Sequence, residues 1–151
     1  SEMPEKKIVL VTNGYINPEP LKKLLPYIDA MNIDLKGDNE FYKSICSGGS
    51  KAVMESIRLA YEMGVHVEVS TLIVGERNSD EKTLTEIGEF IKSVNPDITL
   101  HISRYFPCYR MSDPTTDIET MKKTYHTIKK KIQKKRPEND TSALFRRLTE
   151  I

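Results

Sequence analysis

Four short apolar runs alternate along the chain with segments in which apolar residues recur at helical spacing. The runs have the length of buried strands and cover residues 7–14, 30–35, 65–74 and 98–105. Amphipathic helices are predicted to begin near Pro18, Ser50, Asn78 and Thr116. This order is typical of a parallel sheet covered by helices. We therefore predict an α/β fold of four βα units, forming a half or partial (β/α) barrel with an open curved parallel sheet.

The predicted helices carry recognisable end signals. Asn78 and Thr116 each precede a glutamate by three residues, the spacing of a capping box. Ser50 can cap the helix that follows it, and Gly64 stands where a left-handed helix end belongs.

The helical pattern fades after about residue 129. We expect one folded unit over residues 1–136 and a polar tail over residues 137–151. The tail can contain a short helix around Leu144 and Leu148.

Polar side chains stand near the end of every predicted strand. The candidates for a binding site are Asn13, Asp34, Lys36, Ser70, His101 and Arg104. Because ligands of such folds bind at the carboxyl ends of parallel strands, we expect these groups to converge on one rim.

Asp34 and Lys36 are two residues apart, so their side chains leave the same face of the strand. A carboxylate beside an ammonium offers an acceptor and a donor to a zwitterionic ligand. The alternative is an ion pair that only closes the strand end.

The fourth strand offers two further candidates. His101 shares a face with Ser103, whereas Arg104 points the other way unless the strand twists or ends there. Arg104 can clamp a carboxylate or a phosphate. The alternatives are a hydrogen-bonded core histidine and an arginine at the rim. His66 and Glu68 are interpreted as a structural pair.

Composition narrows the choice of function. The chain has 151 residues, a net charge of +1 and two cysteines, Cys46 and Cys108, in no CxxC pattern. We expect a cytoplasmic protein with reduced thiols, without a membrane helix or signal peptide. Residues 122–136 carry eight basic residues and no acid. A solvated helix face is favoured there over an interface with nucleic acid as a partner.

Several stretches in order resemble one enzyme family. They read VTNGYINPEPL, AMNIDLKGDNEFYKSIC, GVHVEVSTLIV and LHISRYFPCYRM, within a likeness from about residue 8 to about residue 125. The chain resembles the pyruvate formate-lyase activating enzyme family of radical S-adenosylmethionine (SAM) enzymes. Within that family it is most similar to the subgroup called AmmeMemoRadiSam system radical SAM enzymes.

The resemblance implies a partial (β/α)6 barrel that cleaves SAM reductively with a [4Fe–4S] cluster and generates a 5′-deoxyadenosyl radical. Three cysteines of a CxxxCxxC loop hold the cluster in the family, and this motif does not occur here. Cys46 and Cys108 cannot replace three thiolates around one site. Residues 1–136 therefore resemble the C-terminal half of such an enzyme. We expect them to be inactive alone, unable to bind the cluster, and partnered by the missing N-terminal half.

The resemblance also assigns roles to residues. Asp34 and Lys36 match the family's DLK segment, which faces SAM and substrate, and Asn13 lies at the SAM edge. Ser70 stands where activating enzymes have an arginine that contacts SAM. His101 or Arg104 takes the place of a histidine on the last strand. The implied substrate is a protein of glycyl-radical type.

The sequence is compatible with two other functions and with one mode of assembly. Asp34, Lys36 and Asp38 resemble the DxKxxD array of phosphate-sugar barrel lyases, although Asp38 falls one residue short. The basic helix of residues 122–136 would suit a non-enzymatic binding module. Half a barrel would expose its sheet edges and an apolar inner face, so we expect association, including a homodimer through the edges.

Overall fold

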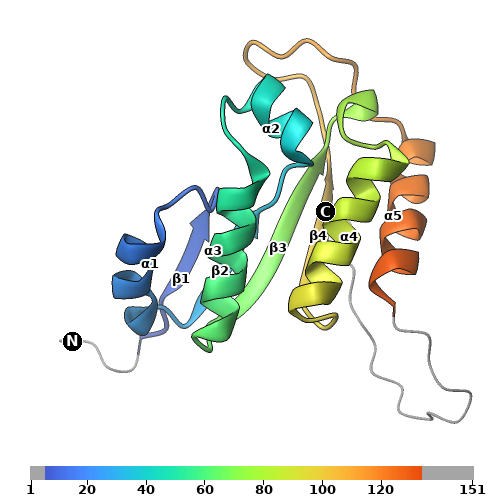
Figure 1. The fold of residues 1–151 in the computed structure, drawn as a ribbon. Coiled ribbons are helices and arrows are strands. Elements are labelled where there is room, and N and C mark those ends of the chain that lie inside the picture. Colours follow the sequence, from blue (N-terminus) through green and yellow to red (C-terminus); the bar gives the residue numbers. More distant parts are fainter. Residues whose placement is uncertain (1–5, 134–151) are drawn as a thin grey trace, which may run out of the picture.

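A computed structural model describes residues 6–133, which contain one four-stranded sheet (Figure 1). The strands are β1 (Val9–Thr12), β2 (Ala30–Asp34), β3 (His66–Ile73) and β4 (Thr99–Arg104). Their order in space is β1-β2-β3-β4, and all three pairings are parallel. The prediction of an open parallel α/β sheet is confirmed.

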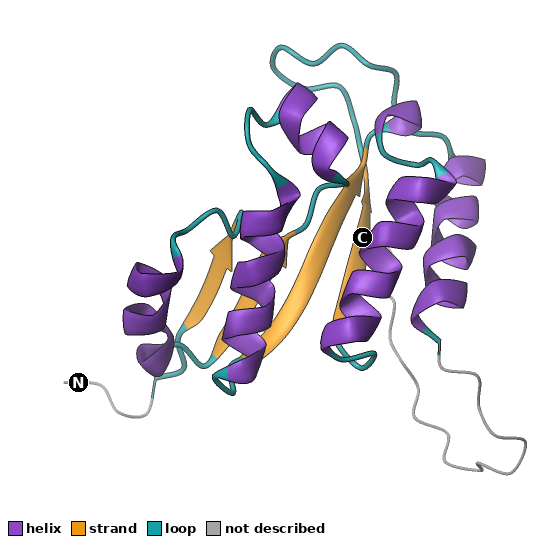
Figure 2. Cartoon of the chain, in the orientation of Figure 1, coloured by secondary structure: helices purple, strands orange, loops and turns teal. Residues whose placement is uncertain are grey.

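Helices connect the strands and pack on one side of the sheet (Figure 2). They are α1 (Pro18–Leu24), α2 (Asn39–Ile45), α3 (Ser50–Glu62), α4 (Glu81–Val94) and α5 (Ile118–Ile132). Two 3-10 turns, Leu25–Tyr27 and Gly75–Arg77, follow α1 and β3. No helix among residues 6–133 is both long and apolar enough to cross a membrane.

The hydrophobic core lies between the sheet and these helices. Alternate residues of the inner strands point into it, including Met31 and Ile33 of β2 and Val67 and Val69 of β3. Burying such side chains contributes about 1.5–3 kcal/mol each, which fixes the register of the strands.

Most of the opposite face of the sheet is polar, which corrects the expectation of an apolar inner face. Asn32, Asp34, Glu68, Ser70 and His101 occupy its alternating positions and are partly exposed. We call these five residues the polar face.

Apolar side chains also occur on this side of the sheet, on edge strand β1 and at Leu72 of β3. Val9 and Val11 of β1 are 60% and 74% exposed, and Leu72 is 42% exposed.

Two predicted caps are wrong. The capping residue is an aspartate that lies two residues after Asn78 in one case and one residue after Thr116 in the other. Asp80 accepts a hydrogen bond from the Thr83 amide and begins α4, and Asp117 does the same for α5. Asn78 and Thr116 are buried instead. Gly49 rather than Ser50 is the cap residue of α3, whereas Gly64 has the predicted left-handed backbone, with φ 82°.

Helix α2 was not predicted, because its seven residues lack the opening proline that marks the equally short α1. Asp38 begins it by accepting a hydrogen bond from the Phe41 amide at 2.9 Å, and Phe41 and Tyr42 are its buried residues. The predicted tail of residues 137–151 lies outside the described residues.

Candidate functional site

The ion pair of Asp34 and Lys36 lies at the carboxyl end of β2. Lys36 Nζ is 2.7 Å from Asp34 Oδ2, and the two side chains are 36% and 39% exposed. A pair this exposed adds only about 0–1 kcal/mol to stability. Its partners therefore remain available to a ligand that offers opposite charges of its own.

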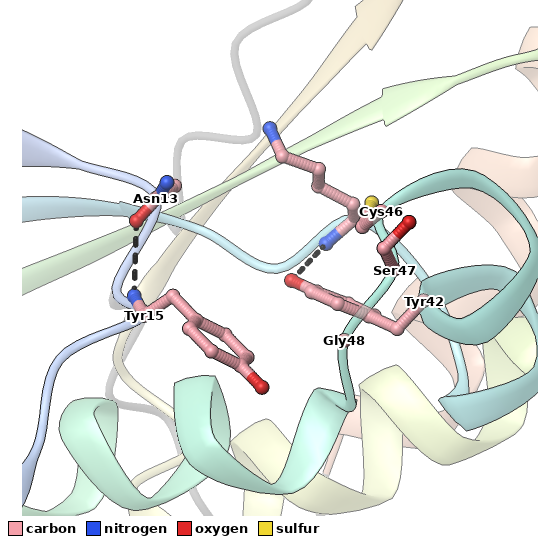
Figure 3. Close-up of a pocket in the computed structure, with 7 residues that line it drawn as sticks. Asn13, Tyr15, Tyr42, Cys46, Ser47 and Gly48 are labelled. Atoms are coloured by element: carbon pink, nitrogen blue, oxygen red, sulfur yellow. Dashed lines mark hydrogen bonds between the residues drawn. The ribbon is translucent and has the colours of Figure 1, made fainter.

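A pocket of about 180 Å³ opens beside this pair (Figure 3). Its lining comes from the turn after β1, the end of β2, and α2 with the loop that follows it. The lining residues are Asn13, Tyr15, Lys36, Tyr42, Cys46, Ser47 and Gly48. The ring of Tyr15 lies so close to Gly48 that an added Cβ would meet its Cε2 at 3.0 Å.

Tyr42 joins the pocket to the ion pair through the backbone. Its hydroxyl donates to the Asp34 carbonyl and accepts from the Lys36 amide, each at 3.2 Å. Burial is the largest cause that raises the pKa of Tyr42 to about 12, so the phenol keeps its proton near neutral pH.

The Cys46 thiol is the nucleophilic group of the pocket. Cys46 is exposed as a residue, but partial burial of its thiol raises the pKa of that group. The Lys36 ammonium acts in the opposite direction because it favours the thiolate.

Three predicted site residues form one row across the polar face. Asp34 pairs in register with Ser70, and Ser70 pairs with His101. The Ser70 hydroxyl donates to Asn32 Oδ1 at 2.8 Å, and His101 Nε2 lies 2.8 Å from Glu68 Oε2. The structure therefore brings Asp34, Ser70 and His101 together on neighbouring strands.

Asn13 and Arg104 lie apart from this row. The Asn13 side chain accepts a hydrogen bond from the Tyr15 amide at 3.0 Å and lines the pocket with Lys36. Arg104 pairs in register with the buried Ile73 and donates to the Thr116 carbonyl before α5. Of the two candidates on β4, His101 is thus the one that faces Ser70.

Glu68 of the polar face links His101 to His66, at the start of β3. His66 Nε2 lies 3.5 Å from Glu68 Oε1, so the expected pairing of His66 with Glu68 is present. The hydrogen bond from His101 is the largest cause that lowers the pKa of Glu68.

Asp38 does not join Asp34 and Lys36 in a common array. It is buried at the start of α2, and its second oxygen pairs with Lys82 of α4 at 3.2 Å. This placement disfavours the phosphate-sugar lyase alternative, which needs a second carboxylate beside the lysine.

The sequence of residues 2–91 matches the family model of the radical SAM superfamily. The chain belongs to the radical SAM superfamily. It is 44% identical over 115 residues to an uncharacterized protein of Methanocaldococcus jannaschii. That match covers 75% of this chain but only 34% of the relative, so the chain spans about a third of the relative's length.

Two solved structures share the fold of this superfamily member. One is the crystal structure of a domain of pyruvate-formate lyase-activating enzyme from Bacteroides vulgatus, with TM-score 0.67 and 16% identity. It covers 81% of this chain and 75% of that one. The other is a radical SAM methyltransferase from Sphaerobacter thermophilus, with TM-score 0.68 and 11% identity. That match covers 82% of this chain and 38% of the methyltransferase.

Sequence reasoning missed Tyr42 and Asn78 as parts of the site. Asn78 is fully buried, and its side-chain amide donates to the Lys36 carbonyl at 2.7 Å. The only signal for Tyr42 was its place in the stretch FYKSIC, and the capping-box spacing of Asn78 pointed to a different role.

Proposed function

We propose that this chain is the SAM-orienting part of a pyruvate formate-lyase activating enzyme-like radical SAM enzyme of the AmmeMemoRadiSam subgroup. The observation that carries the proposal is the half-exposed Asp34–Lys36 pair at the carboxyl end of β2, in a chain of this superfamily. When bound with its iron–sulfur cluster, SAM supplies the radical chemistry.

The charges of the site suit the amino-acid end of SAM. That end carries an ammonium and a carboxylate, which complement the Asp34 carboxylate and the Lys36 ammonium. Ser70 and His101 continue the row from Asp34 onto β3 and β4. They would limit how far the bound ligand extends across these strands. Asn13 lies on the other side of Lys36, across the pocket.

The residues of this chain do not fit the iron–sulfur cluster. Cluster ligation in the family needs three thiolates, and the sequence holds two cysteines. Within residues 6–133, no three His, Cys, Asp or Glu side chains are grouped so that they could hold a metal ion. We therefore assign the cluster ligands to polypeptide outside these 151 residues.

A titration of the isotope-labelled chain with SAM, followed by nuclear magnetic resonance, tests the proposal. We expect chemical-shift changes at Asn13, Asp34 to Lys36, and Ser70. Lys36→Met and Asp34→Asn should each weaken binding about ten- to a hundredfold, because a charge-assisted contact is worth roughly 1.5–3 kcal/mol.

The exposed pair of Lys7 and Asp29 provides the matched control. It has a similar N–O distance, 2.9 Å, but precedes β1 and β2 instead of following them. Lys7→Met should therefore leave SAM affinity unchanged. Shifts confined to other regions, or equal losses in Lys7→Met and Lys36→Met, would refute the assignment. Binding of a sugar phosphate in place of SAM would revive the lyase alternative.

A further inference from the structure

Three consecutive carbonyls at the end of β2 each receive a hydrogen bond from a side chain. Tyr42 of α2 donates to Asp34 O at 3.2 Å. Thr71 of β3 donates to Leu35 O at 2.7 Å. Asn78, before α4, donates to Lys36 O at 2.7 Å. The backbone that carries both charges of the site is thus held from three separate elements.

The three donors are buried, which makes these bonds costly to break. Thr71 and Asn78 have no exposed surface, and Tyr42 is 3% exposed. A buried carbonyl such as Leu35 O that loses its donor keeps the desolvation penalty without compensation, and the partly buried Asp34 O and Lys36 O keep part of it. The protonated phenol of Tyr42 can also hold the Lys36 amide at the same time.

Asn78 fixes this segment relative to the neighbouring strand. Its amide nitrogen also donates to the Leu72 carbonyl at 2.8 Å, and its oxygen accepts from the Val74 amide at 2.8 Å. One side chain therefore spans Lys36 and the end of β3. The distance between the ends of β2 and β3 is therefore fixed for any ligand group that binds between them.

We infer that Tyr42, Thr71 and Asn78 are positioning residues that hold Asp34 and Lys36 in a fixed arrangement for SAM. This inference rests on the proposed function for its ligand, and on the carbonyl contacts for its geometry. A site that is already ordered loses less conformational entropy when the ligand binds, so these residues raise affinity by ordering the Asp34–Lys36 segment.

Two isosteric substitutions test the inference against matched controls. Tyr42→Phe and Thr71→Val remove hydroxyls that act on the Asp34–Lys36 segment. Tyr105→Phe removes a buried hydroxyl that donates to the Met111 carbonyl. Thr116→Val removes one that donates to Ile73 O and accepts from the Gly75 amide, at the end of β3.

The expected result separates positioning from stability. Tyr42→Phe and Thr71→Val should weaken SAM binding about five- to tenfold in the titration described above. Tyr105→Phe and Thr116→Val should change it by less than about twofold, although their melting temperatures fall comparably. Equal affinities in all four variants would overturn the inference.

A measurement without ligand keeps this test independent of the proposed function. In the free chain, backbone ¹⁵N order parameters at residues 34–36 should fall in Thr71→Val and stay constant in Thr116→Val. If wild type binds no SAM, the proposed function fails, and this comparison decides the positioning role. Unchanged order parameters at residues 34–36 in both Tyr42→Phe and Thr71→Val would overturn it.

Discussion

His101 Nε2 lies 2.8 Å from Glu68 Oε2 across the β3–β4 pairing, on the polar face of the sheet. The other ring nitrogen, Nδ1, is buried and has no hydrogen-bond partner among the described residues. The Glu68 contact therefore fixes the orientation of the imidazole next to Ser70. His66 approaches the same carboxylate from the other side, at 3.5 Å.

Glu68 should stabilise the fold in a pH-dependent way. Its pKa is lowered from an ordinary value of 4.5, chiefly by the hydrogen bond from His101. A lowered carboxyl pKa adds stability above the unfolded value, and this stability is lost as pH falls through the folded value. Glu68→Gln should therefore lower the free energy of unfolding near pH 7 by up to about 1 kcal/mol, since the side chain is partly exposed.

Urea unfolding at a series of pH values checks this expectation. The difference between Glu68→Gln and wild type should shrink as pH falls through 4.5 and below. Glu19→Gln is the control, because Glu19 is 78% exposed and its surface pair with Lys22 should have little effect at any pH. A difference that stayed constant down to acid pH would show that packing, not charge, is responsible.

The fold was predictable because each strand is a short apolar run, and because alternate side chains of β2, β3 and β4 are buried. All four strand regions and their parallel order follow from apolar runs separated by helical periodicity. The caps were not, because Asn78 and Asp80 are both good capping residues within three positions of each other. Burial decided between them: Asn78 is needed at the strand ends, which leaves Asp80 for the helix.

The candidate site was predictable only where spacing along one strand decides the geometry. The pairing of Asp34 with Lys36 follows from a separation of two residues. The pocket depends on Tyr15 and Tyr42, which reach it from the β1–α1 turn and from the unpredicted α2. No local pattern could have shown which residues of these distant segments meet.

Gly14 is required where the chain turns out of β1 beside Asn13. It has φ 70°, and an added Cβ would stand 2.6 Å from Ile33 Cγ2 and 3.0 Å from Val53 Cγ1. Gly14→Ala should therefore combine backbone strain with overpacking, roughly 2–5 kcal/mol in total. Chemical denaturation of the purified variant measures this loss.

Gly64 provides the comparison for that measurement. Its φ is 82°, but an added Cβ would meet nothing within 4 Å. Gly64→Ala should show only the backbone contribution, about 1–2 kcal/mol. Equal losses in the two variants would contradict the close packing between the β1 turn, β2 and α3.

The charge of Lys36 should be detectable at Cys46. Partial burial raises the pKa of the Cys46 thiol, and the Lys36 ammonium partly offsets this. Because the thiolate is the reacting form, Lys36→Met should raise the pKa further and slow alkylation at a fixed pH. The rate of iodoacetamide modification, in a Cys108→Ser background, measures the effect.

Lys43→Met controls for the loss of a nearby positive charge. Lys43 belongs to α2 and pairs with Glu40 at 3.5 Å, and it is not a neighbour that shifts the Cys46 pKa. Its replacement should leave the alkylation rate within about twofold of wild type. A rate insensitive to Lys36→Met would place the ammonium outside the pocket in solution.

The outer edge of β1 should be where the polypeptide with the cluster ligands joins this chain. Within residues 6–133, β1 pairs with β2 on one side only, and its Val9 and Val11 are largely exposed. A parallel strand added there would pair with the backbone of β1, and its own side chains would pack beside both valines on the same face. Val11→Lys should therefore reduce binding of that polypeptide at least tenfold, measured by sedimentation velocity with the two components mixed.

Ile118→Lys is the control variant. It alters an exposed apolar residue at the start of α5 and should bind like wild type. Undiminished binding by Val11→Lys would exclude β1 as the joining edge and direct attention to β4, the other end of the sheet.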